Sequence, residues 1–269
     1  GPVGGAHRRA GEGRVNHDRP VQFTFDGRVI SALEGDTVAS ALLASGVHLT
    51  GRSFKYHRPR GILTAGSEEP NALIGTDRGP GRREPNTRAT VQEVFEGLRT
   101  TSQNRWPSLR VDIGVVNDLA SPLIGAGFYY KTFMKPRGFW DKVYEPLIRK
   151  AAGLGTAPDA IDPDTYTSRY AHADVLVVGA GAAGIAAALC AGRAGARVML
   201  VDEQNEIGGG LLSDPDAVID GQAAWTWLTA AAAELEGMGH VTVLPRATAI
   251  AYNHQNMVAV AERLTDHLA

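Results

Sequence analysis

The sequence predicts an α+β domain followed by an α/β domain with a parallel sheet. Two observations support this prediction: a hairpin signal at Asp26-Gly27 leads into a capped helix, and two strand-like runs, the apolar residues 175–178 and residues 197–201, flank a glycine-rich turn and an alanine-rich segment. With 269 residues, of which 43% are hydrophobic, the chain can form two domains with separate cores. This composition excludes a chain that is disordered throughout.

The charge balance and the single cysteine exclude several functional classes. Lys and Arg number 27 against 29 Asp and Glu, a formal net charge of −2, which argues against a general nucleic-acid-binding protein. Cys190 is the only cysteine, so the chain holds no internal disulfide and no four-thiolate zinc or iron–sulfur site. We expect Cys190 to be a small buried residue. The eight histidines show no metal-ligand spacing, and no metal site is expected.

Neither a membrane span nor an export signal is expected. The most apolar stretch, residues 175–191, is interrupted by glycines and is too short to cross a bilayer comfortably. The arginines of residues 1–20 are followed by no apolar run, which argues against a secretory or twin-arginine signal. We therefore expect a cytoplasmic protein, with residues 1–16 forming a flexible arm.

Local patterns predict the first elements of the α+β domain. Residues 21–30 alternate around Asp26-Gly27, a dipeptide typical of a two-residue hairpin. Thr37 is the expected cap of a helix that Gly46 ends. The sequence that follows is rich in Arg, Gly and Pro and has weak periodicity, with one expected helix at residues 90–100.

Residues 111–170 are predicted to be an aromatic-rich connector that ends in a linker at residues 159–170. Charged residues and prolines interrupt the connector, so it is not a membrane segment. Two interpretations stay open: the aromatic side chains cover a partner surface, or they wrap the chain's own domain. The aromatic residues concerned are Phe128, Tyr129, Tyr130, Phe133, Phe139, Trp140 and Tyr144.

The α/β domain is expected to begin near Asp174. The apolar run at residues 175–178 is typical of a strand in a parallel sheet whose two faces are both covered. A turn and helix at residues 179–195 and a strand at residues 197–201 complete one βαβ unit. Beyond it we expect a helix at residues 222–236, a strand at residues 241–244 and a hairpin at residues 248–263.

A G-x-G-x-x-G motif spans Gly179 to Gly184, between the predicted strand and helix, and in this context it indicates a Rossmann-type dinucleotide-binding turn. Gly179 allows a tight turn, Gly181 lets the backbone approach a pyrophosphate, and Gly184 permits close packing of helix on strand. The helix N-terminus, with Ala182 and Ala183, offers unpaired N–H groups to the phosphates. A glycine-rich turn without a ligand is the alternative.

Acidic and glycine residues after the second strand extend this candidate site. Asp202, at the end of the strand, is expected to accept hydrogen bonds from the adenosine ribose, with Glu203 as the adjacent candidate. An acid at this position favours NAD or FAD, since it would repel a 2′-phosphate. Gly209 and Gly210, in the run Gly208–Gly210, could bring the backbone close to the pyrophosphate, and a flexible loop is the alternative.

The segment 52–60 concentrates four positive charges without an acid. It could bind a flavin phosphate, a folate tail or an acidic surface of a partner chain, and a solvated loop is the plainer interpretation. His57 is a conceivable catalytic base, but the sequence identifies no partner acid for it. No nucleophile motif such as G-x-S-x-G occurs, so no catalytic residue is assigned.

A set of segments distributed along nearly the whole chain matches a known family. The most specific is residues 51–62, which belongs to no common fold signature. The others are residues 23–28, 34–47, 67–73, 127–134, 144–149 and 174–210. Together they resemble the N-terminal part of the α subunit of heterotetrameric sarcosine oxidases.

The resemblance implies a ferredoxin-like β-grasp domain at residues 17–110 that lacks a [2Fe–2S] cluster. Relatives with a cluster place several cysteines where residues 51–66 of this chain hold none. It also implies a Rossmann-type NAD-binding domain at residues 171–269, of which this chain supplies the first half. In the family, FMN lies at the interface with the β subunit, and FAD lies on the β subunit, where sarcosine is oxidised.

The family's α subunit also has a folate-binding part, which this sequence does not contain. The strand that would complete the nucleotide site is missing as well, so we expect a split subunit or a fragment. The expected partners are the remainder of the α subunit, the β subunit and smaller subunits of the oxidase.

The leading hypothesis is an NAD-binding component of an oxidoreductase that acts on CH–NH groups. The resemblance implies oxidative demethylation of sarcosine to glycine, with hydrogen peroxide and, when tetrahydrofolate is present, 5,10-methylenetetrahydrofolate. Two alternatives stay open. One is a subunit of an FAD-dependent reductase or opine-type amine dehydrogenase, and the other is a structural assembly module with a non-catalytic nucleotide.

Overall fold

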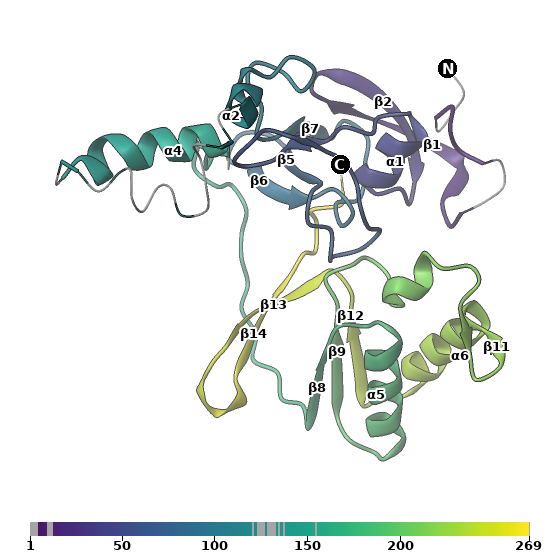
Figure 1. Cartoon of the computed structure of the whole chain (residues 1–269). Helices are drawn as coiled ribbons and strands as arrows, with labels where there is room; N and C mark the ends of the chain where they lie inside the picture. Colours follow the sequence, from purple (N-terminus) through teal and green to yellow (C-terminus); the bar gives the residue numbers. More distant parts are fainter. Residues whose placement is uncertain are drawn as a thin grey trace. The chain divides into compact units, whose positions relative to one another are not determined.

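The computed structural model of the chain describes residues 5–9, 13–119, 121–122, 127, 133, 135–136, 138–153 and 155–268. The chain divides into two compact units (Figure 1), of which the first holds residues 1–64 and 69–164 and the second holds residues 65–68 and 165–268. Each unit has a hydrophobic core of its own, as the composition predicts.

The first unit is built on a five-stranded mixed sheet with the order β2-β1-β7-β5-β6. Strands β1 and β2 form the predicted hairpin, in which Phe25 pairs with Arg28 across Asp26 and Gly27. Both turn residues have positive φ, 49° and 78°, as a type I′ turn requires. The strands are β1 (Asn16–Phe25), β2 (Arg28–Glu34), β5 (Leu73–Asp77), β6 (Arg83–Arg88) and β7 (Arg99–Ser102).

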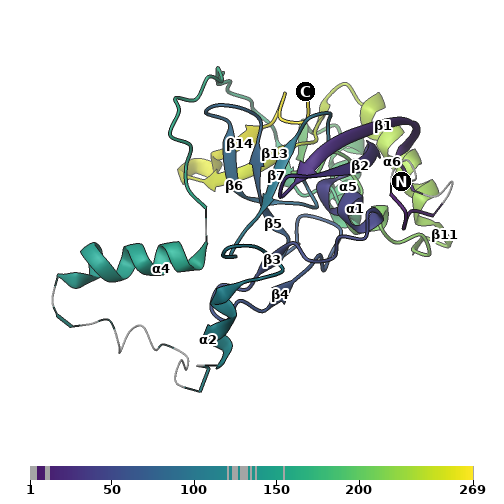
Figure 2. The ribbon, with the colours of Figure 1, turned by 90° about the horizontal axis from the view of Figure 1, so that it is seen from above.

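The predicted helix is confirmed as α1 (Val38–Ala44), which lies alongside the β1–β2 hairpin (Figure 2). Thr37 caps it: the Thr37 hydroxyl accepts a hydrogen bond from Ser40 N at 3.2 Å, and Ser40 Oγ accepts one from Thr37 N at 3.0 Å. Gly46 ends the helix with a φ of 72°. The helix buries its apolar face in a core whose largest members are Phe23, Ile30, Val38, Leu42, Ile74 and Leu98.

The helix expected at residues 90–100 is wrong, because this segment pairs with the start of α1. Val38 N donates to Gln92 O and Ala39 N donates to Ala89 O, each at 2.8 Å. Carbonyls that would form a local helix instead satisfy the first N–H groups of α1, which lack partners within their own helix. The segment consequently runs as turns into strand β7.

Only part of the aromatic connector lies within the described residues. Tyr144 is in contact with Phe133 and Phe139, with ring centroids 4.9 and 6.2 Å apart, and it precedes α4 (Glu145–Ala152). Phe139 and Trp140 are about half exposed. Phe128, Tyr129 and Tyr130 lie outside the described residues. The predicted linker at residues 159–170 has neither helix nor strand.

The second unit contains a three-stranded parallel sheet with the order β12-β9-β8, and its strands are β8 (Val175–Val178), β9 (Val198–Val201) and β12 (Val241–Leu244). In-register pairing joins Val175 to Val198 and Val198 to Val241. Within the described part of the chain β8 pairs with β9 alone, so it forms an edge of this sheet, and Val178 is 59% exposed.

Two helices, α5 (Ala182–Arg193) and α6 (Ala224–Gly237), pack with this sheet, as predicted. A hairpin of β13 (Ala247–Tyr252) and β14 (Val258–Glu262) follows β12, also as predicted. Shorter pairs join β3 (Gly51–Arg52) to β4 (Pro59–Arg60) and β10 (Val218–Ile219) to β11 (Gln222–Ala223). Within the described residues, none of the helices is both long and apolar enough to cross a membrane.

The expected burial of Cys190 is wrong: its side chain is exposed. Helix α5 buries the set Ile185, Ala188, Leu189 and Gly192, which lies on one face at helical spacing. Cys190 lies on the opposite face of the same helix. An alanine-rich helix therefore does not bury every small residue that it contains.

Candidate functional site

The glycine motif occupies the turn between β8 and α5, where the sequence places it. Gly179 has a φ of 97°, and its N–H donates to Val201 O at 2.8 Å, which ties the turn to the neighbouring strand. A Cβ on Gly184 would lie 1.8 Å from Gly179 O, so only glycine allows the helix to pack this closely on the turn. The predicted conformational roles of Gly179 and Gly184 are thus confirmed.

The N-terminus of α5 is open toward solvent. Gly181 is the N-cap residue, supplies no side-chain cap, and is followed by no acidic residue in the first turn. A Cβ on Gly181 would meet no described atom within 4 Å. The N–H groups of Ala182, Ala183 and Gly184, at the positive end of the helix dipole, therefore border open space that can accept an anion.

Asp202 holds the glycine turn from the end of β9. Its Oδ2 accepts a hydrogen bond from Ala180 N at 2.6 Å, and its Oδ1 accepts one from Gln204 N at 2.8 Å. The sequence suggests a ribose contact for Asp202 but gives no sign of this second role. Because each carboxylate oxygen has two lone pairs, both oxygens retain the capacity to accept a further bond. The carbonyl of Glu203, the alternative ribose candidate, accepts a bond from the Arg263 side chain at 2.5 Å.

The glycine run after β9 lies against the glycine turn. Gly208 N donates to Ala180 O at 2.7 Å, and Gly208 forms a bridge with Gly181. A Cβ on Gly209 would lie 3.0 Å from Gly181 Cα, so a side chain there would crowd the turn. A Cβ on Gly210 would meet no described atom within 4 Å. The structure thus shows that Ala180, within the predicted motif, and Gly208, within the predicted glycine run, join the two segments of this site.

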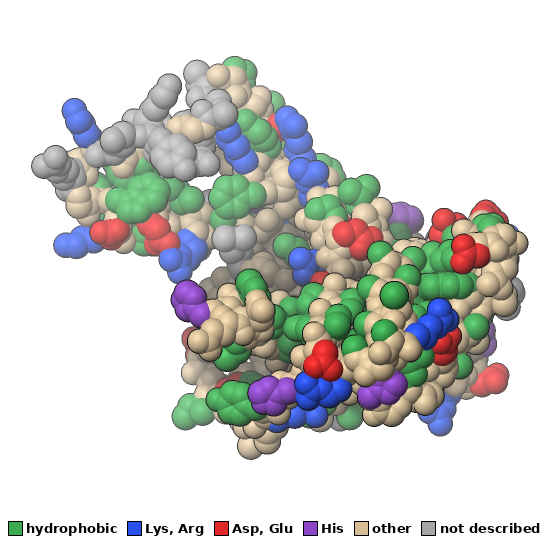
Figure 3. All heavy atoms as spheres, turned by 90° about the horizontal axis from the view of Figure 1, so that it is seen from below, with side chains coloured by type: hydrophobic (Ala, Val, Ile, Leu, Met, Phe, Trp, Pro, Cys, Tyr) green, Lys and Arg blue, Asp and Glu red, His purple; other side chains and the backbone are tan. Residues whose placement is uncertain are grey.

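The second unit has another hollow, of about 260 Å³, at the amino ends of its strands, away from the glycine turn. Its rim carries Arg169 and Arg197 together with two histidines, and Figure 3 shows basic, acidic and histidine side chains close together on the lower face. Both arginines are paired, Arg169 with Glu262 and Arg197 with Asp174. The Arg197 hydrogen bonds lower the pKa of Asp174 to about 2. This hollow is therefore not an open anion site.

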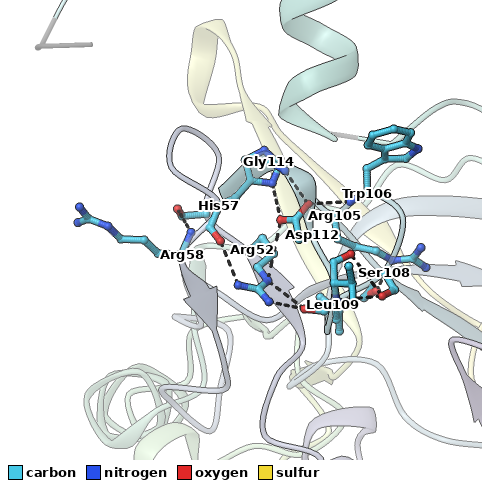
Figure 4. Close-up of polar contacts among 12 residues, drawn as sticks. Arg52, His57, Arg58, Arg105, Trp106, Ser108, Leu109, Asp112 and Gly114 are labelled. Carbon is cyan, nitrogen blue, oxygen red and sulfur yellow. Dashed lines mark hydrogen bonds and ion pairs between the residues drawn. The ribbon is translucent and has the colours of Figure 1, made fainter. Parts of the chain in front are cut away.

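In the first unit, the basic segment 52–60 is anchored by a buried polar network (Figure 4). His57 Nδ1 lies 2.7 Å from Asp112 Oδ2, so Asp112 is the partner acid that the sequence does not identify. Arg52 donates to the carbonyls of Leu109 and His57. Arg58 pairs with Asp118 at 2.8 Å. Three of the segment's polar side chains are thus bound within the chain, which corrects the picture of a wholly solvated loop.

A second buried carboxylate, that of Glu69, accepts hydrogen bonds from the backbone that follows the basic segment 52–60. Glu69 is 2% exposed. Burial raises the pKa of Glu69, but the four backbone N–H bonds outweigh this effect, and the net pKa lies below its ordinary value. The donors are the N–H groups of Leu63, Thr64, Asn71 and Ala72, at 2.6–3.1 Å, with the Thr64 hydroxyl at 3.1 Å.

These contacts bear on whether the first unit could hold an iron–sulfur cluster. Residues 51–66 contain no cysteine, and Cys190 belongs to the second unit. Within the described residues, no group of three or more His, Cys, Asp and Glu side chains is placed to hold a metal ion. The residues present do not fit a [2Fe–2S] cluster, and protein hydrogen bonds hold this loop.

Comparisons with known proteins match each of the two units to a family of its own. Residues 18–105 match a family described as "2Fe-2S iron-sulfur cluster binding domain", and residues 174–265 match one described as "FAD dependent oxidoreductase". The second description supports a flavin-type domain at the glycine turn. It gives no support to NAD on this chain, which stays a prediction.

Two curated relatives match almost the whole chain. The α subunit of sarcosine oxidase from Rhizobium meliloti (strain 1021) is 58% identical over 98% of this chain, and that from Corynebacterium sp. (strain U-96) is 37% identical over 95%. The predicted resemblance to these subunits is confirmed. The match covers 26% and 22% of the two relatives, so the chain spans about a quarter of their length.

A solved structure shares the fold. L-proline dehydrogenase from P. horikoshii aligns with a TM-score of 0.54 over 92% of this chain and 38% of its own, at 16% identity. At this identity the likeness concerns the fold alone.

Proposed function

We propose that this chain, which is similar to sarcosine oxidase α subunits over 98% of its length, is the dinucleotide-binding component of a multi-subunit amine oxidoreductase. One observation carries the proposal: an uncapped helix N-terminus at Gly181 opens onto free space, and the turn before it is held by Asp202 and Gly208. Such a turn is prepared for a pyrophosphate before any ligand arrives.

The residues of a Rossmann-type site would divide the work in the following way. The N–H groups of Ala182, Ala183 and Gly184 would receive the pyrophosphate, and Gly181 would let it approach the backbone. Asp202 would accept the ribose hydroxyls through its remaining lone pairs while it keeps Ala180 in place. Glu203 is the second candidate for the ribose, and Gly209 and Gly210 would line the far side of the pyrophosphate.

NAD is the dinucleotide that we propose for this chain, on the basis of the resemblance, and the acid at Asp202 is compatible with NAD and FAD alike. FAD is the second candidate, because the family matched by residues 174–265 is described as FAD dependent. Equilibrium titration of the full chain with each dinucleotide separates them. Tight binding of FAD, with a flavin absorption band that survives gel filtration, would reject NAD in favour of FAD.

Amine oxidation itself is proposed to occur on a partner subunit, because no catalytic residue is assigned to this chain. In this proposal the whole assembly demethylates sarcosine to glycine and hydrogen peroxide, and it forms 5,10-methylenetetrahydrofolate when tetrahydrofolate is present. FMN would lie at the interface with the β subunit and FAD on the β subunit. The matched relatives support the proposal because they are named as subunits and are about four times longer than this chain.

An assembly module with a structural nucleotide is the alternative. The half-exposed Phe139 and Trp140 favour it, since aromatic side chains of this kind are enriched at protein interfaces. Mass spectrometry of the complex purified through this chain distinguishes the two. Flavin-containing partner chains with amine oxidase activity support the proposal, and partners without flavin or activity support the assembly module.

A further inference from the structure

A hollow of about 280 Å³ lies in the first unit beside the short β3–β4 hairpin. This volume is near the lower end of the range of small-molecule sites, about 300–1,000 Å³. Two arginines and four side-chain amides contribute to its wall, and no carboxylate does. The lining residues are Gly51, Arg52, Ser53, Phe54, Arg60, Pro70, Asn71, Leu73, Asn86, Gln103 and Asn104.

The two arginines of the hollow differ in what they bind. The guanidinium of Arg52 donates to the carbonyls of Leu109 and His57 and lies 3.9 Å from a carboxylate oxygen of Asp112. The guanidinium of Arg60 forms neither a hydrogen bond nor an ion pair with any described residue. The hollow therefore carries a positive charge that the described part of the chain does not neutralise.

Two side-chain amides in the wall of the hollow also lack a hydrogen-bonding partner among the described residues. The side chains of Asn71 and Asn104 form no hydrogen bond with the described part of the chain, whereas Gln103 is bonded to Asn86 at 2.8 and 3.1 Å. Half-buried amides without partners are available to a ligand, and each offers two N–H donors. The ring of Phe54, 50% exposed, adds a flat apolar surface at the same hollow.

We propose that this hollow binds a small oxyanion carried on a flat ring, a phosphate monoester or a carboxylate. The guanidinium of Arg60 would hold two oxygens of the anion, the geometry that arginine offers to both groups. Asn71 and Asn104 would donate further hydrogen bonds, and Phe54 would stack on the ring. The site belongs to the first unit and is independent of the glycine turn, so it stands whether or not that turn binds a dinucleotide.

The test titrates the full chain with inorganic phosphate, phenyl phosphate and benzoate and follows the backbone amides of residues 51–60 and 103–104 by NMR. We expect phenyl phosphate or benzoate to bind more tightly than inorganic phosphate because of Phe54. The tighter of the two ring ligands identifies the oxyanion. Absence of shifts with all three probes up to about 10 mM, which corresponds to less than about 3 kcal/mol of binding, would overturn the proposal.

Variants separate this hollow from other anion sites. Arg60→Gln should weaken binding about tenfold to a hundredfold, the range for losing a charged hydrogen-bonding partner. Arg58→Gln is the matched control, because Arg58 is exposed and bound to Asp118, and it should leave affinity unchanged. Gly181→Val should also leave it unchanged. Equal affinity in Arg60→Gln, or loss of binding in Gly181→Val, would assign the anion to another place and reject the hollow.

Discussion

His57 Nδ1 lies 2.7 Å from Asp112 Oδ2, although 55 residues separate the two in the sequence. Asp112 is 8% exposed, and its other oxygen accepts hydrogen bonds from Trp106 N at 2.9 Å and Gly114 N at 3.2 Å. Because the ionised carboxylate can only accept, His57 Nδ1 carries the proton of this hydrogen bond. Gly114 makes room for the ring, since a Cβ there would lie 2.3 Å from Nδ1. This pair connects the basic segment to the chain after β7.

Asp112→Ala should therefore destabilise the first unit. It leaves His57 Nδ1 and the two backbone N–H groups without an acceptor, and we expect the free energy of unfolding to fall by about 2–4 kcal/mol. Urea denaturation measures the change. Asp118→Ala is the control: its exposed pair with Arg58 should contribute less than about 1 kcal/mol. An equal loss of unfolding free energy in the two variants would show that the buried Asp112 network stabilises the unit no more than an exposed ion pair does.

Two glycines of the same turn should respond differently to the same substitution. Gly184→Ala places a Cβ 1.8 Å from Gly179 O and forces the helix away from the turn, whereas Gly181→Ala meets no described atom within 4 Å. We expect Gly184→Ala to lower the stability of the second unit by about 1–3 kcal/mol and Gly181→Ala to leave it nearly unchanged. Thermal unfolding of both variants measures the two changes in stability. A harmless Gly184→Ala would mean that the turn is looser than the structure shows.

Glu69 gives the first unit a pH dependence of known sign. Its pKa is below the ordinary value of 4.5, so its contribution to stability is complete above that pH and is lost as pH falls through the folded-state pKa. Glu69→Gln cannot accept all of the same hydrogen bonds and should cost about 1–3 kcal/mol near neutral pH. Urea denaturation from about pH 6 down to pH 3 should show the difference from wild type shrinking. A difference that stays constant would show that the Glu69 carboxylate is not the group that titrates.

Asp202→Ala should affect both the glycine turn and the ligand. Loss of the bond to Ala180 N frees that amide, so its hydrogen exchange should accelerate in the absence of any ligand. Dinucleotide binding should weaken by about 1–3 kcal/mol. Unchanged affinity together with faster exchange would move the ribose contact to Glu203 and leave Asp202 with a structural role alone.

Local patterns were sufficient for much of the fold. The Asp26-Gly27 turn, the Thr37 cap and the βαβ unit around Gly179 are each set by neighbouring residues, and all of them form as predicted. The helix expected at residues 90–100 does not form, because the carbonyls of Ala89 and Gln92 accept hydrogen bonds from α1, a partner that periodicity within the segment does not reveal.

In the candidate site, too, the sequence predicted the local features but not the contacts between distant residues. The motif located the turn, because its glycines serve a conformation that neighbouring residues determine. The Asp202–Ala180 bond depends on how β9 registers against β8, and the His57–Asp112 pair depends on the path of the whole first unit. The residues in each of these contacts are far apart in the sequence. Composition and short motifs therefore could not predict the contacts.

Calorimetric titration of Gly181→Val with NAD and with FAD tests the central claim most directly, with Gly239→Val as a control. Gly239 has no described atom near its hypothetical Cβ and lies at the amino ends of the strands, away from the turn. We expect wild type and Gly239→Val to bind one of the dinucleotides equally, and Gly181→Val to bind it about a hundredfold more weakly, a loss of about 2.7 kcal/mol. Equal affinity in all three proteins would contradict the assignment of the dinucleotide to this turn.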